Sequence, residues 1–327
     1  MKKLIYVLLA AIVTIAAAGC SNNASGKDQV KPEKIVLDYA YYSPVSLVLK
    51  ENGWAEEAFE KEGIEVEFVL SQGSNKALEF LNSKSVDFGS TAGAAALMAK
   101  AKGSPIESVY IYSKPEWTAL VTTDSNIKSV KDLKGKKVAA TLGTDPYIFL
   151  LRALNEEGLS ASDVEIVNLQ HGDGAAALGT GQVDAWAGLD PHMAKVELET
   201  GAELFYRNAD FNTYGVLNVR SEFAEEYPEY VEKVIELYEK ARVWAEENPD
   251  KTAEILAEQA QIKPDVAAKQ LERTDLSNPI PGDAQIQSIT AAGDVLQQGD
   301  VIQKDANVEE IVNSLINPKF AEKVINK

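Results

Sequence analysis

The chain has 327 residues, with 32 basic and 50 acidic side chains and a formal net charge of −18. Such a surface repels nucleic acid and anionic lipid headgroups, which disfavours a polyanionic partner. The single cysteine excludes an internal disulfide, so the fold must be held by packing. A chain of this length exceeds one typical hydrophobic core, which predicts two lobes.

The first 20 residues read MKKLIYVLLAAIVTIAAAGC, with a basic start, an apolar run from Leu4 to Ala18 and the cysteine at the end. As a helix, this 15-residue run would span roughly 22 Å, less than the roughly 30 Å of a bilayer core. The segment therefore predicts a cleaved export signal and not a permanent membrane span.

The three small residues before Cys20, together with the cysteine, resemble the lipobox of bacterial lipoproteins. The resemblance implies that residues 1–19 are removed as the signal and that Cys20 becomes a lipidated N-terminus. Two acyl chains, such as palmitate, suffice for stable anchoring. The alternative is an ordinary signal peptide with an incidental cysteine.

After the signal, residues 20–34 form a polar stretch without aromatic side chains, which predicts a flexible tether. Strand-like and helix-like segments then alternate. Apolar and acidic residues alternate from Ile64 to Leu70, as in a strand with one covered face. Ser74 is placed to cap the next helix. The predicted segments are strands at 35–40, 64–70, 86–89 and 109–113, and helices at 45–62, 74–82 and 92–102.

A second alternating series begins near residue 129 and predicts another α/β unit. Its predicted segments are a short helix and turn at 129–137, strands at 138–141, 164–169 and 183–187, and helices at 146–154 and 172–180. Beyond residue 220 helices predominate, beginning with an amphipathic helix at 227–247. Strands that alternate with helices predict mostly parallel, doubly wound sheets.

Four segments carry a resemblance to a known family. They are VDFGST at 86–91, LKGKKVA at 133–139, LLRAL at 150–154 and VDAWAGLDP at 183–191. Over about residues 35–270 the chain resembles the solute-binding proteins of ABC importers for aliphatic sulfonates, taurine and nitrate. That group also holds binders of thiamine-precursor pyrimidines. The resemblance implies a type 2 periplasmic-binding-protein fold.

The family resemblance further implies two α/β lobes that close by a hinge motion on a ligand in the cleft between them. The first lobe would comprise residues 35–121 and 218–327, and the second lobe would be an insertion at 122–217. In sulfonate binders Gly-Asp follows the Ser-Thr pair, whereas this chain has Ala92 and Gly93 there. This departure leaves the ligand subclass open.

Small polar residues are predicted at one helix N-terminus in each lobe: Ser90 and Thr91 in the first, Gly143 and Thr144 in the second. Each pair lies where a strand ends and a helix begins, the usual ligand position in open α/β sheets. Helix N-termini offer unpaired N–H groups and partial positive charge, so they can bind a sulfonate without lysine or arginine. The alternative is that these hydroxyls only cap their own helices.

Aromatic residues are predicted to form the apolar walls for a small amphipathic ligand. The candidates are Tyr41, Tyr42, Trp117, Tyr147, Trp186 and Tyr214. For the two tryptophans, packing in the core is the alternative. Gln72 and Asn75 are predicted to contact the other end of the ligand.

Asp145 and Asp190 are the acidic candidates for the cleft. Carboxylates repel a purely anionic ligand, so an aspartate in the cleft predicts a ligand that also carries an amine, as taurine does. The alternative for Asp190 is that it caps the helix that Pro191 begins.

No catalytic or metal site is predicted. His171 and His192 are the two histidines, and no further group of metal-ligand residues accompanies them, so no zinc site is predicted. Both histidines are expected to be loop or surface residues. The sequence contains no Gly-x-Ser-x-Gly elbow and no Gly-x-x-x-x-Gly-Lys-Ser/Thr phosphate loop. No cofactor is expected.

The sequence therefore predicts a monomeric, non-enzymatic lipoprotein on the extracytoplasmic face of the cell membrane. It would capture a small sulfonate, either an alkanesulfonate or a taurine-like compound, and deliver it to an ABC permease. Alternatives on the same fold are a binder of nitrate or of a thiamine-precursor pyrimidine and, less favoured, a cofactor-biosynthetic enzyme. The export signal speaks against the enzyme.

Overall fold

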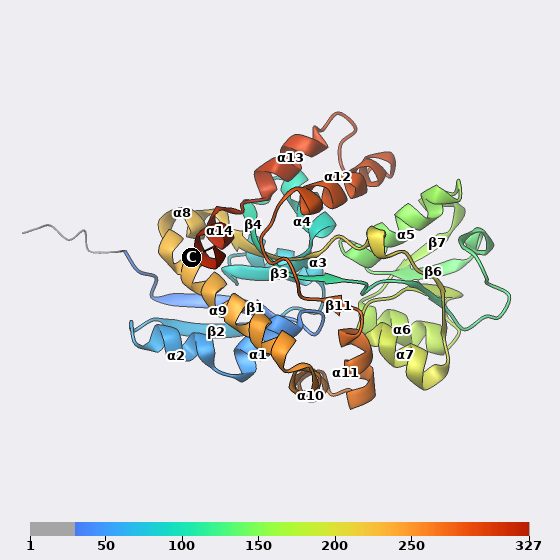
Figure 1. Ribbon diagram of the computed structural model, residues 1–327. Helices are drawn as coiled ribbons and strands as arrows, with labels where there is room; N and C mark the ends of the chain where they lie inside the picture. Colours follow the sequence, from blue (N-terminus) through green and yellow to red (C-terminus); the bar gives the residue numbers. More distant parts are fainter. Residues whose placement is uncertain (1–29, 327) are drawn as a thin grey trace, which may run out of the picture. The chain divides into compact units, whose positions relative to one another are not determined.

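A computed structural model describes residues 30–326 of the chain. The predicted signal, Cys20 and most of the predicted tether lie outside these residues. Two β-sheets with helices packed around them make up the described chain (Figure 1). The α/β class expected from the sequence is confirmed.

Six strands form the first sheet: β1 (Lys34–Tyr39), β2 (Glu65–Leu70), β3 (Phe88–Ala92), β4 (Ile106–Pro115), β10 (Gly215–Arg220) and β11 (Thr274–Asp275). Their order across the sheet is β11-β4-β10-β3-β1-β2. Strand β1 is parallel to both of its neighbours, and β10 runs antiparallel between β3 and β4. Strand β11 is antiparallel to β4, so β1–β4 run in one direction and β10 and β11 in the other. The sheet is therefore mixed, and the mostly parallel arrangement predicted from the sequence holds for β1–β3 but not across β10, which returns from the second lobe.

Five strands form the second sheet: β5 (Leu120–Thr122), β6 (Lys137–Ala140), β7 (Glu165–Asn168), β8 (Ala185–Ala187) and β9 (Glu203–Tyr206). Their order is β7-β6-β8-β5-β9. Strand β6 is parallel to β7 and β8, and β5 is antiparallel to β8 and β9. We call each sheet with its packed helices a lobe, the first and the second in that order.

Two short connections join the sheets. The first linker, residues 116–119, leads from β4 to β5, and the second linker, residues 207–214, returns from β9 to β10. Sequence reasoning expected the crossings after residues 121 and 217. The structure has them a few residues earlier, because β5 pairs in the second sheet and β10 is already in the first sheet at Gly215.

Helices connect successive strands within both lobes (Figure 1). In the first lobe they are α1 (Pro44–Glu51), α2 (Trp54–Glu60), α3 (Ser74–Asn82) and α4 (Gly93–Ala101), and in the second α5 (Asp145–Glu156), α6 (His171–Gly179) and α7 (His192–Thr200). The single helix predicted at 45–62 is interrupted, because Gly53 adopts a left-handed φ of +63° between α1 and α2.

Strand β3 extends further than the sequence suggested. Ser90 and Thr91 were expected to open a helix, but Ser90 pairs with Leu217 and Thr91 with Val216 of β10. Since β10 pairs along the whole end of β3, the strand continues to residue 92 and α4 begins only at Gly93. Both hydroxyl residues are therefore inside the sheet.

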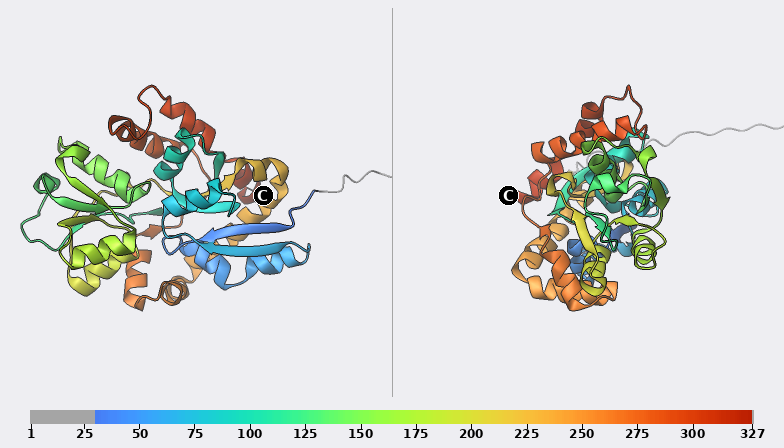
Figure 2. Two further views of the ribbon diagram at one scale, coloured as in Figure 1. Left: turned by 180° about the vertical axis from the view of Figure 1, so that it is seen from behind. Right: turned by 90° about the vertical axis from the view of Figure 1, so that its right-hand side faces the viewer.

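The C-terminal third is helical and covers the first sheet. Its helices are α8 (Ser221–Glu226), α9 (Pro228–Glu247), α10 (Pro249–Ala260), α11 (Pro264–Leu271), α12 (Asp283–Gln298), α13 (Val308–Leu315) and α14 (Lys319–Ile325). Figures 1 and 2 show α9–α11 and α12–α13 on opposite sides of the first sheet. Helix α11 also contacts α7, and α12 contacts α5, so this region touches the second lobe at two places.

Candidate functional site

A cavity of about 220 Å³, here called the cleft cavity, lies between loops of the two lobes. In the first lobe it is lined by residues that follow β1 and β2, and in the second by residues that follow β7 and β8. The lining residues are Tyr41, Tyr42, Ser71, Gln72, Gln170, His171, Gly172, Asp173, Leu189, Asp190, Pro191 and His192. All four loops leave the carboxyl ends of strands, the position that ligands occupy in open α/β sheets.

The first turns of α6 and α7 form part of the cavity wall. Helix α6 begins at His171 and α7 at His192, both of which line the cavity. The first N–H groups of a helix have no partner within it, and the helix dipole adds partial positive charge. Among the described lining residues none is a lysine or arginine. In α7 the N–H groups of residues 193–195 already have partners within the protein, so an anionic ligand group would be held mainly at the start of α6.

His171 is only 1% exposed and has a fixed tautomer. Its Nδ1 lies 3.2 Å from the Thr141 hydroxyl, which lies 2.6 Å from the carbonyl oxygen of Leu169. The carbonyl can only accept, so the threonine donates its single hydrogen there and accepts one from His171 Nδ1–H. The other ring nitrogen, Nε2, is then a bare acceptor, and it is buried without a hydrogen-bond partner.

Burial lowers the pKa of His171 to about 3, and the nearby His192 adds to the shift. The ring is therefore neutral at neutral pH. The prediction that His171 is a loop or surface residue is wrong, because α6 packs its first residue inward against Thr141. His192 is half-buried, and burial followed by the charge of Lys195 lowers its pKa as well.

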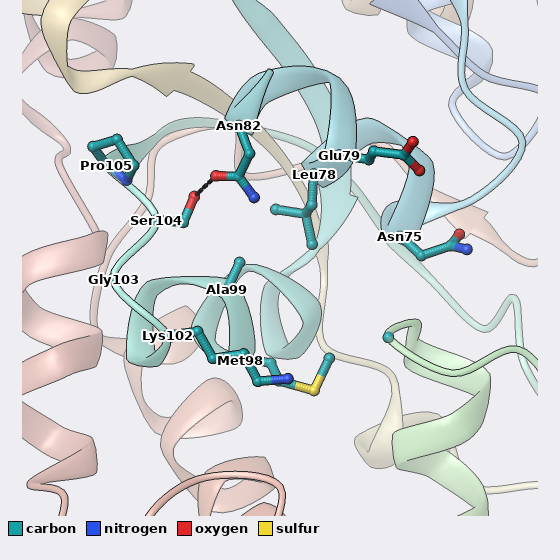
Figure 3. A pocket seen from close by; sticks show the side chains of 11 residues that line it. Asn75, Leu78, Glu79, Asn82, Met98, Ala99, Lys102, Gly103, Ser104 and Pro105 are labelled. Atoms are coloured by element: carbon teal, nitrogen blue, oxygen red, sulfur yellow. Dashed lines mark hydrogen bonds between the residues drawn. The ribbon is translucent and has the colours of Figure 1, made fainter. Parts of the chain in front are cut away.

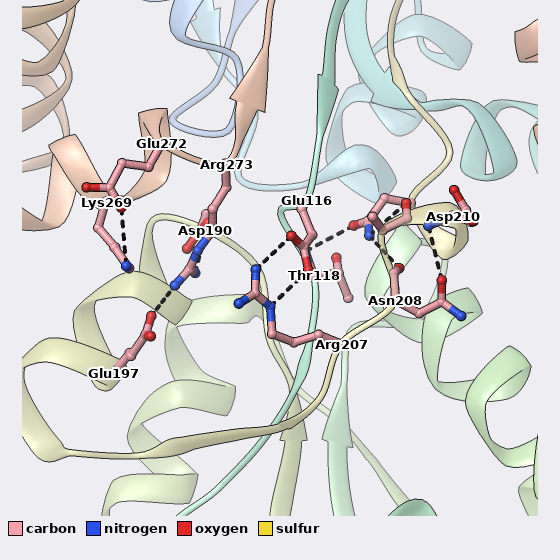
Figure 4. Close-up of polar contacts among 12 residues, drawn as sticks. Glu116, Thr118, Asp190, Glu197, Arg207, Asn208, Asp210, Lys269, Glu272 and Arg273 are labelled. Carbon is pink, nitrogen blue, oxygen red and sulfur yellow. Dashed lines mark hydrogen bonds and ion pairs between the residues drawn. The ribbon is translucent and has the colours of Figure 1, made fainter.

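Asp190 lines the cavity but is engaged by protein groups. Its Oδ1 accepts a 2.8 Å hydrogen bond from the Ala194 N–H in the first turn of α7. Its Oδ2 lies 3.4 Å from the Arg273 guanidinium, which also pairs with Glu197 (Figure 4). Burial raises the pKa of Asp190 to about 6, and Arg273 opposes the shift. The capping alternative is thus confirmed, and a ligand contact stays a prediction.

On the first-lobe side, Tyr41, Tyr42 and Gln72 line the cleft cavity as predicted. Tyr42 donates its hydroxyl hydrogen to the Ser90 carbonyl at 2.9 Å and packs edge-to-face against Trp117, with ring centroids 5.8 Å apart. Tyr41 is half-buried, and its carbonyl oxygen accepts a 2.8 Å hydrogen bond from the Gln270 side chain. These contacts fix one aromatic wall of the cavity.

Asp145 binds the two linkers and does not line the cleft cavity. Its carboxylate accepts from Trp117 Nε1 at 3.0 Å, from the Thr213 N–H at 3.1 Å and from the Thr213 hydroxyl at 2.6 Å. Burial raises the pKa of Asp145, and these hydrogen bonds oppose the shift. Trp117 belongs to the first linker and Thr213 to the second, so Asp145 holds α5 against both connections between the lobes.

Further contacts tie the linkers to each other (Figure 4). Arg207 binds the Glu116 carboxylate through two hydrogen bonds of 2.9 and 2.7 Å. The Asn212 side chain accepts from the Thr118 N–H at 3.1 Å. The two linkers are therefore one hydrogen-bonded unit and not two independent segments.

The predicted anion-binding hydroxyls are buried inside the protein. Ser90 donates its N–H to Asp38, and its hydroxyl is buried without a hydrogen-bond partner. The Thr91 hydroxyl accepts from Asn218 within the first sheet. Thr144 donates its hydroxyl hydrogen to the carbonyl of Thr141. None of Ser90, Thr91 and Thr144 lines the cleft cavity. The two predicted N-termini are therefore not the ones that reach it.

Three predicted aromatic contacts also lie elsewhere. Trp186 is fully buried in the core of the second lobe, where a Cβ added to Gly174 would lie 2.6 Å from its Nε1. Tyr147 is half-buried and packs against the cores of both lobes. Tyr214 is half-buried with the Lys114 ammonium 5.8 Å from its ring centroid. The core alternative holds for Trp186, since β8 is an interior strand of its sheet.

A second cavity of about 450 Å³ lies between α3 and α4 (Figure 3). Gly143, which reaches it from the second lobe, has a left-handed φ of +82°. Asn75 lines this cavity and not the cleft cavity. Ser104 donates a hydrogen bond to Asn82 across one side of the opening. Gly143 therefore faces a different space from the other predicted ligand contacts.

Within residues 30–326, no group of three or more His, Cys, Asp or Glu side chains is arranged to hold a metal ion. In the same range no helix is both long enough and apolar enough to cross a membrane.

A model of the family described as NMT1/THI5 like matches residues 46–252. The chain belongs to the NMT1/THI5-like family. The family resemblance inferred from the sequence is confirmed, and the matched range includes every residue that lines the cleft cavity except those that follow β1 directly.

Relatives of this NMT1/THI5-like chain are named as binding proteins. An aliphatic sulfonates-binding protein of Bacillus subtilis (strain 168) is 31% identical over 327 residues, covering 98% of each chain. One of the same name from Escherichia coli (strain K12) is 26% identical over 317 residues, covering 95% of this chain and 96% of the relative.

A solved structure is similar as well. The alkanesulfonate-binding protein of Xanthomonas axonopodis pv. citri, bound to MOPS, superposes with a TM-score of 0.80 at 24% identity, covering 88% of this chain and 99% of the other. This likeness establishes the periplasmic-binding-protein fold for the NMT1/THI5-like chain.

Sequence reasoning missed most of the second-lobe wall of the cleft cavity. The segment from Gln170 to Asp173 and the histidine at 192 were not proposed as ligand contacts. A usable signal was present, because the predicted strand at 164–169 ends directly before a predicted helix at 172. That is the same strand-to-helix pattern that singled out Gly143 and Thr144.

Proposed function

We propose that this chain is the extracytoplasmic solute-binding protein of an ABC importer and that it captures a small sulfonate. The observation that carries the proposal is the cleft cavity, which both lobes line and which two helix N-termini of the second lobe face. The names of the relatives support the ligand class. The geometry supports a binding protein because the loops of both lobes must meet to enclose the cavity.

The proposed sulfonate binding uses backbone dipoles and not a cationic side chain. A sulfonate spreads one negative charge over three oxygens, and the N–H groups at the start of α6 can donate to more than one of them, while the dipole of α7 adds partial positive charge. Tyr41 and Tyr42 would contact the apolar part of the ligand. The size of the cavity, about 220 Å³, suits a short-chain compound.

The hinge contacts support capture by closure of the lobes. Asp145 joins α5 of the second lobe to both linkers, so the lobes are expected to rotate about this buried point. A ligand that contacts both lobes favours the closed arrangement by its differential affinity. The permease would then receive the closed, monomeric complex.

The membrane anchor is part of the same proposal. Lipidated Cys20 and the tether would keep the binding protein at the outer face of the cell membrane and raise its effective concentration near the permease. In cells, Cys20→Ala should shift the protein from the membrane fraction to the soluble or unprocessed fraction. Ligand affinity should not change, and a variant that stays membrane-bound would contradict lipid anchoring.

Titration calorimetry on the chain from residue 21 onward tests the ligand class. Ethanesulfonate and taurine are expected to bind more tightly than about 1 mM, against nitrate and a formylated aminopyrimidine as competitors for the same site. Absence of binding by every sulfonate tested would overturn the proposal. Recovery of the bound ligand unchanged, checked by mass spectrometry after long incubation, separates a binding protein from an enzyme.

A further inference from the structure

Two unpartnered polar atoms from opposite lobes lie beside one glycine at the edge of the cleft cavity. Nε2 of His171 in the second lobe and Oδ1 of Asn75 in the first are both buried without a hydrogen-bond partner. A Cβ added to Gly73 would lie 2.9 Å from the histidine nitrogen and 2.8 Å from the asparagine oxygen. The two acceptors therefore flank the same glycine, next to Gln72 in the wall of the cleft cavity.

Gly73 is needed there for space. Its φ of 170° is extended backbone that any residue adopts, so glycine is not required by conformation. A side chain would instead collide with His171 and Asn75. Both polar atoms are buried against Gly73 where the lobes meet, and no side chain stands between them. A small group of a ligand can therefore reach them only when the lobes separate.

His171 cannot present anything but an acceptor to this position. Its Nδ1 hydrogen is committed to Thr141, whose own hydrogen is committed to Leu169, and burial keeps the ring neutral. A buried acceptor left without a donor is unfavourable. If the lobes close on a ligand without a hydrogen-bond donor, His171 Nε2 stays unpaired. If they close on a ligand with a donor, His171 Nε2 accepts its hydrogen bond.

The charges around the cavity favour the same kind of ligand. Asp173 and Asp190 line it, and no lysine or arginine does among the described lining residues. Asp190 is paired with Arg273, whereas Asp173 is exposed. A ligand that is only an anion is repelled by this carboxylate. In a ligand with an ammonium group, attraction between the ammonium and the carboxylate offsets the repulsion.

We propose that the ligand carries an N–H or O–H donor beside its sulfonate, and that His171 Nε2 is the specificity-determining acceptor for it. The inference rests on the proposed function and names the substrate class within it. An ammonium donates to this nitrogen with a full positive charge, a hydroxyl donates without one, and a methyl group does not donate. Affinity should fall in the order 2-aminoethanesulfonate, 2-hydroxyethanesulfonate, ethanesulfonate.

Titration calorimetry with these three compounds, at pH 7.5 and fixed ionic strength, tests the proposal. In the wild-type chain the amino compound is expected to bind at least roughly tenfold more tightly than ethanesulfonate, with the hydroxy compound between them. The quantity compared is the ratio of the two affinities within one variant, so a general weakening of binding cancels.

His171→Asn and His171→Gln form a matched pair. The asparagine amide can take the place of Nδ1 toward Thr141 but offers nothing at Nε2, whereas the glutamine carbonyl oxygen reaches the position of Nε2. The ratio should fall roughly tenfold in His171→Asn and be largely kept in His171→Gln. Thermal unfolding of both variants confirms that they are folded.

The outcomes separate the inference from the proposed function. Equal binding of all three sulfonates by the wild type, or the same ratio in His171→Asn as in the wild type, would overturn the inference and leave sulfonate binding intact. Failure of all three to bind would overturn both. An ordered series with loss only in His171→Asn supports both.

Discussion

Because His171 is buried and neutral, we predict that it lowers the free energy of unfolding of the protein as pH falls. In the folded chain its pKa is about 3, against an ordinary value of 6.5. As pH falls below 6.5 the unfolded chain takes up a proton that the folded chain does not, so stability is lost between these two values. For a shift of this size, the loss between pH 7 and pH 4.5 is roughly 2–3 kcal/mol.

Urea unfolding of the wild type and of His171→Asn at both pH values measures this loss. Asp38 and Asp190, whose pKa values burial raises to about 6, act in the opposite direction, because their folded forms hold protons more strongly than the unfolded chain. Both aspartates remain in the variant, so their effect cancels in the difference. The wild type should lose roughly 2–3 kcal/mol more than the variant. If the difference in unfolding free energy between the wild type and His171→Asn is the same at pH 7 and pH 4.5, the reasoning is refuted.

Three further substitutions test the assignments in the second lobe and at the hinge. Trp186→Ala should lower the unfolding free energy by about 3–5 kcal/mol in a denaturant titration, because it leaves a cavity in the core. A variant of unchanged stability with lost ligand affinity would instead show that Trp186 contacts the ligand. Asp145→Asn should lower the free energy of unfolding by roughly 1–3 kcal/mol, because an amide cannot accept all three hydrogen bonds from the linkers. An unaltered melting temperature would argue against the role of Asp145 in joining the linkers. Gly73→Ala should weaken sulfonate binding, because the added Cβ would lie 2.9 Å from His171 Nε2 and obstruct the approach of the lobes; wild-type affinity would contradict that. The same Cβ crowds Asn75 of its own lobe, so a small drop in melting temperature is expected as well.

The sequence predicted the architecture well because local patterns decide it. The alternating residues of Ile64–Leu70 form β2, one residue shorter, and the strand-to-helix change near Gly143 is at the start of α5. The failures arise from contacts between distant segments. Ser90 and Thr91 are in a strand because β10, about 125 residues later, pairs with them.

The candidate site was predicted less completely for the same reason. Asp145 looks like a cleft residue from its position after a strand, and only the return of Thr213 from the second linker shows that its carboxylate is already occupied. His171 looks like a surface residue in a polar, glycine-rich segment. Its burial depends on Thr141 at the end of a neighbouring strand and on Gly73 from the other lobe.

The place of β10 between β3 and β4 has a consequence for the order of folding. All five strands of the second sheet are contiguous in the chain, from residue 120 to 206, so that sheet can close as soon as this stretch is available. The first sheet cannot join β3 to β4 until residues 215–220 arrive between them. In a chain that emerges N-terminus first, the inserted lobe should therefore fold before the lobe that surrounds it. In pulse-labelling hydrogen exchange during refolding, amides of β6–β8 should gain protection before those of β4, and the reverse order would contradict this.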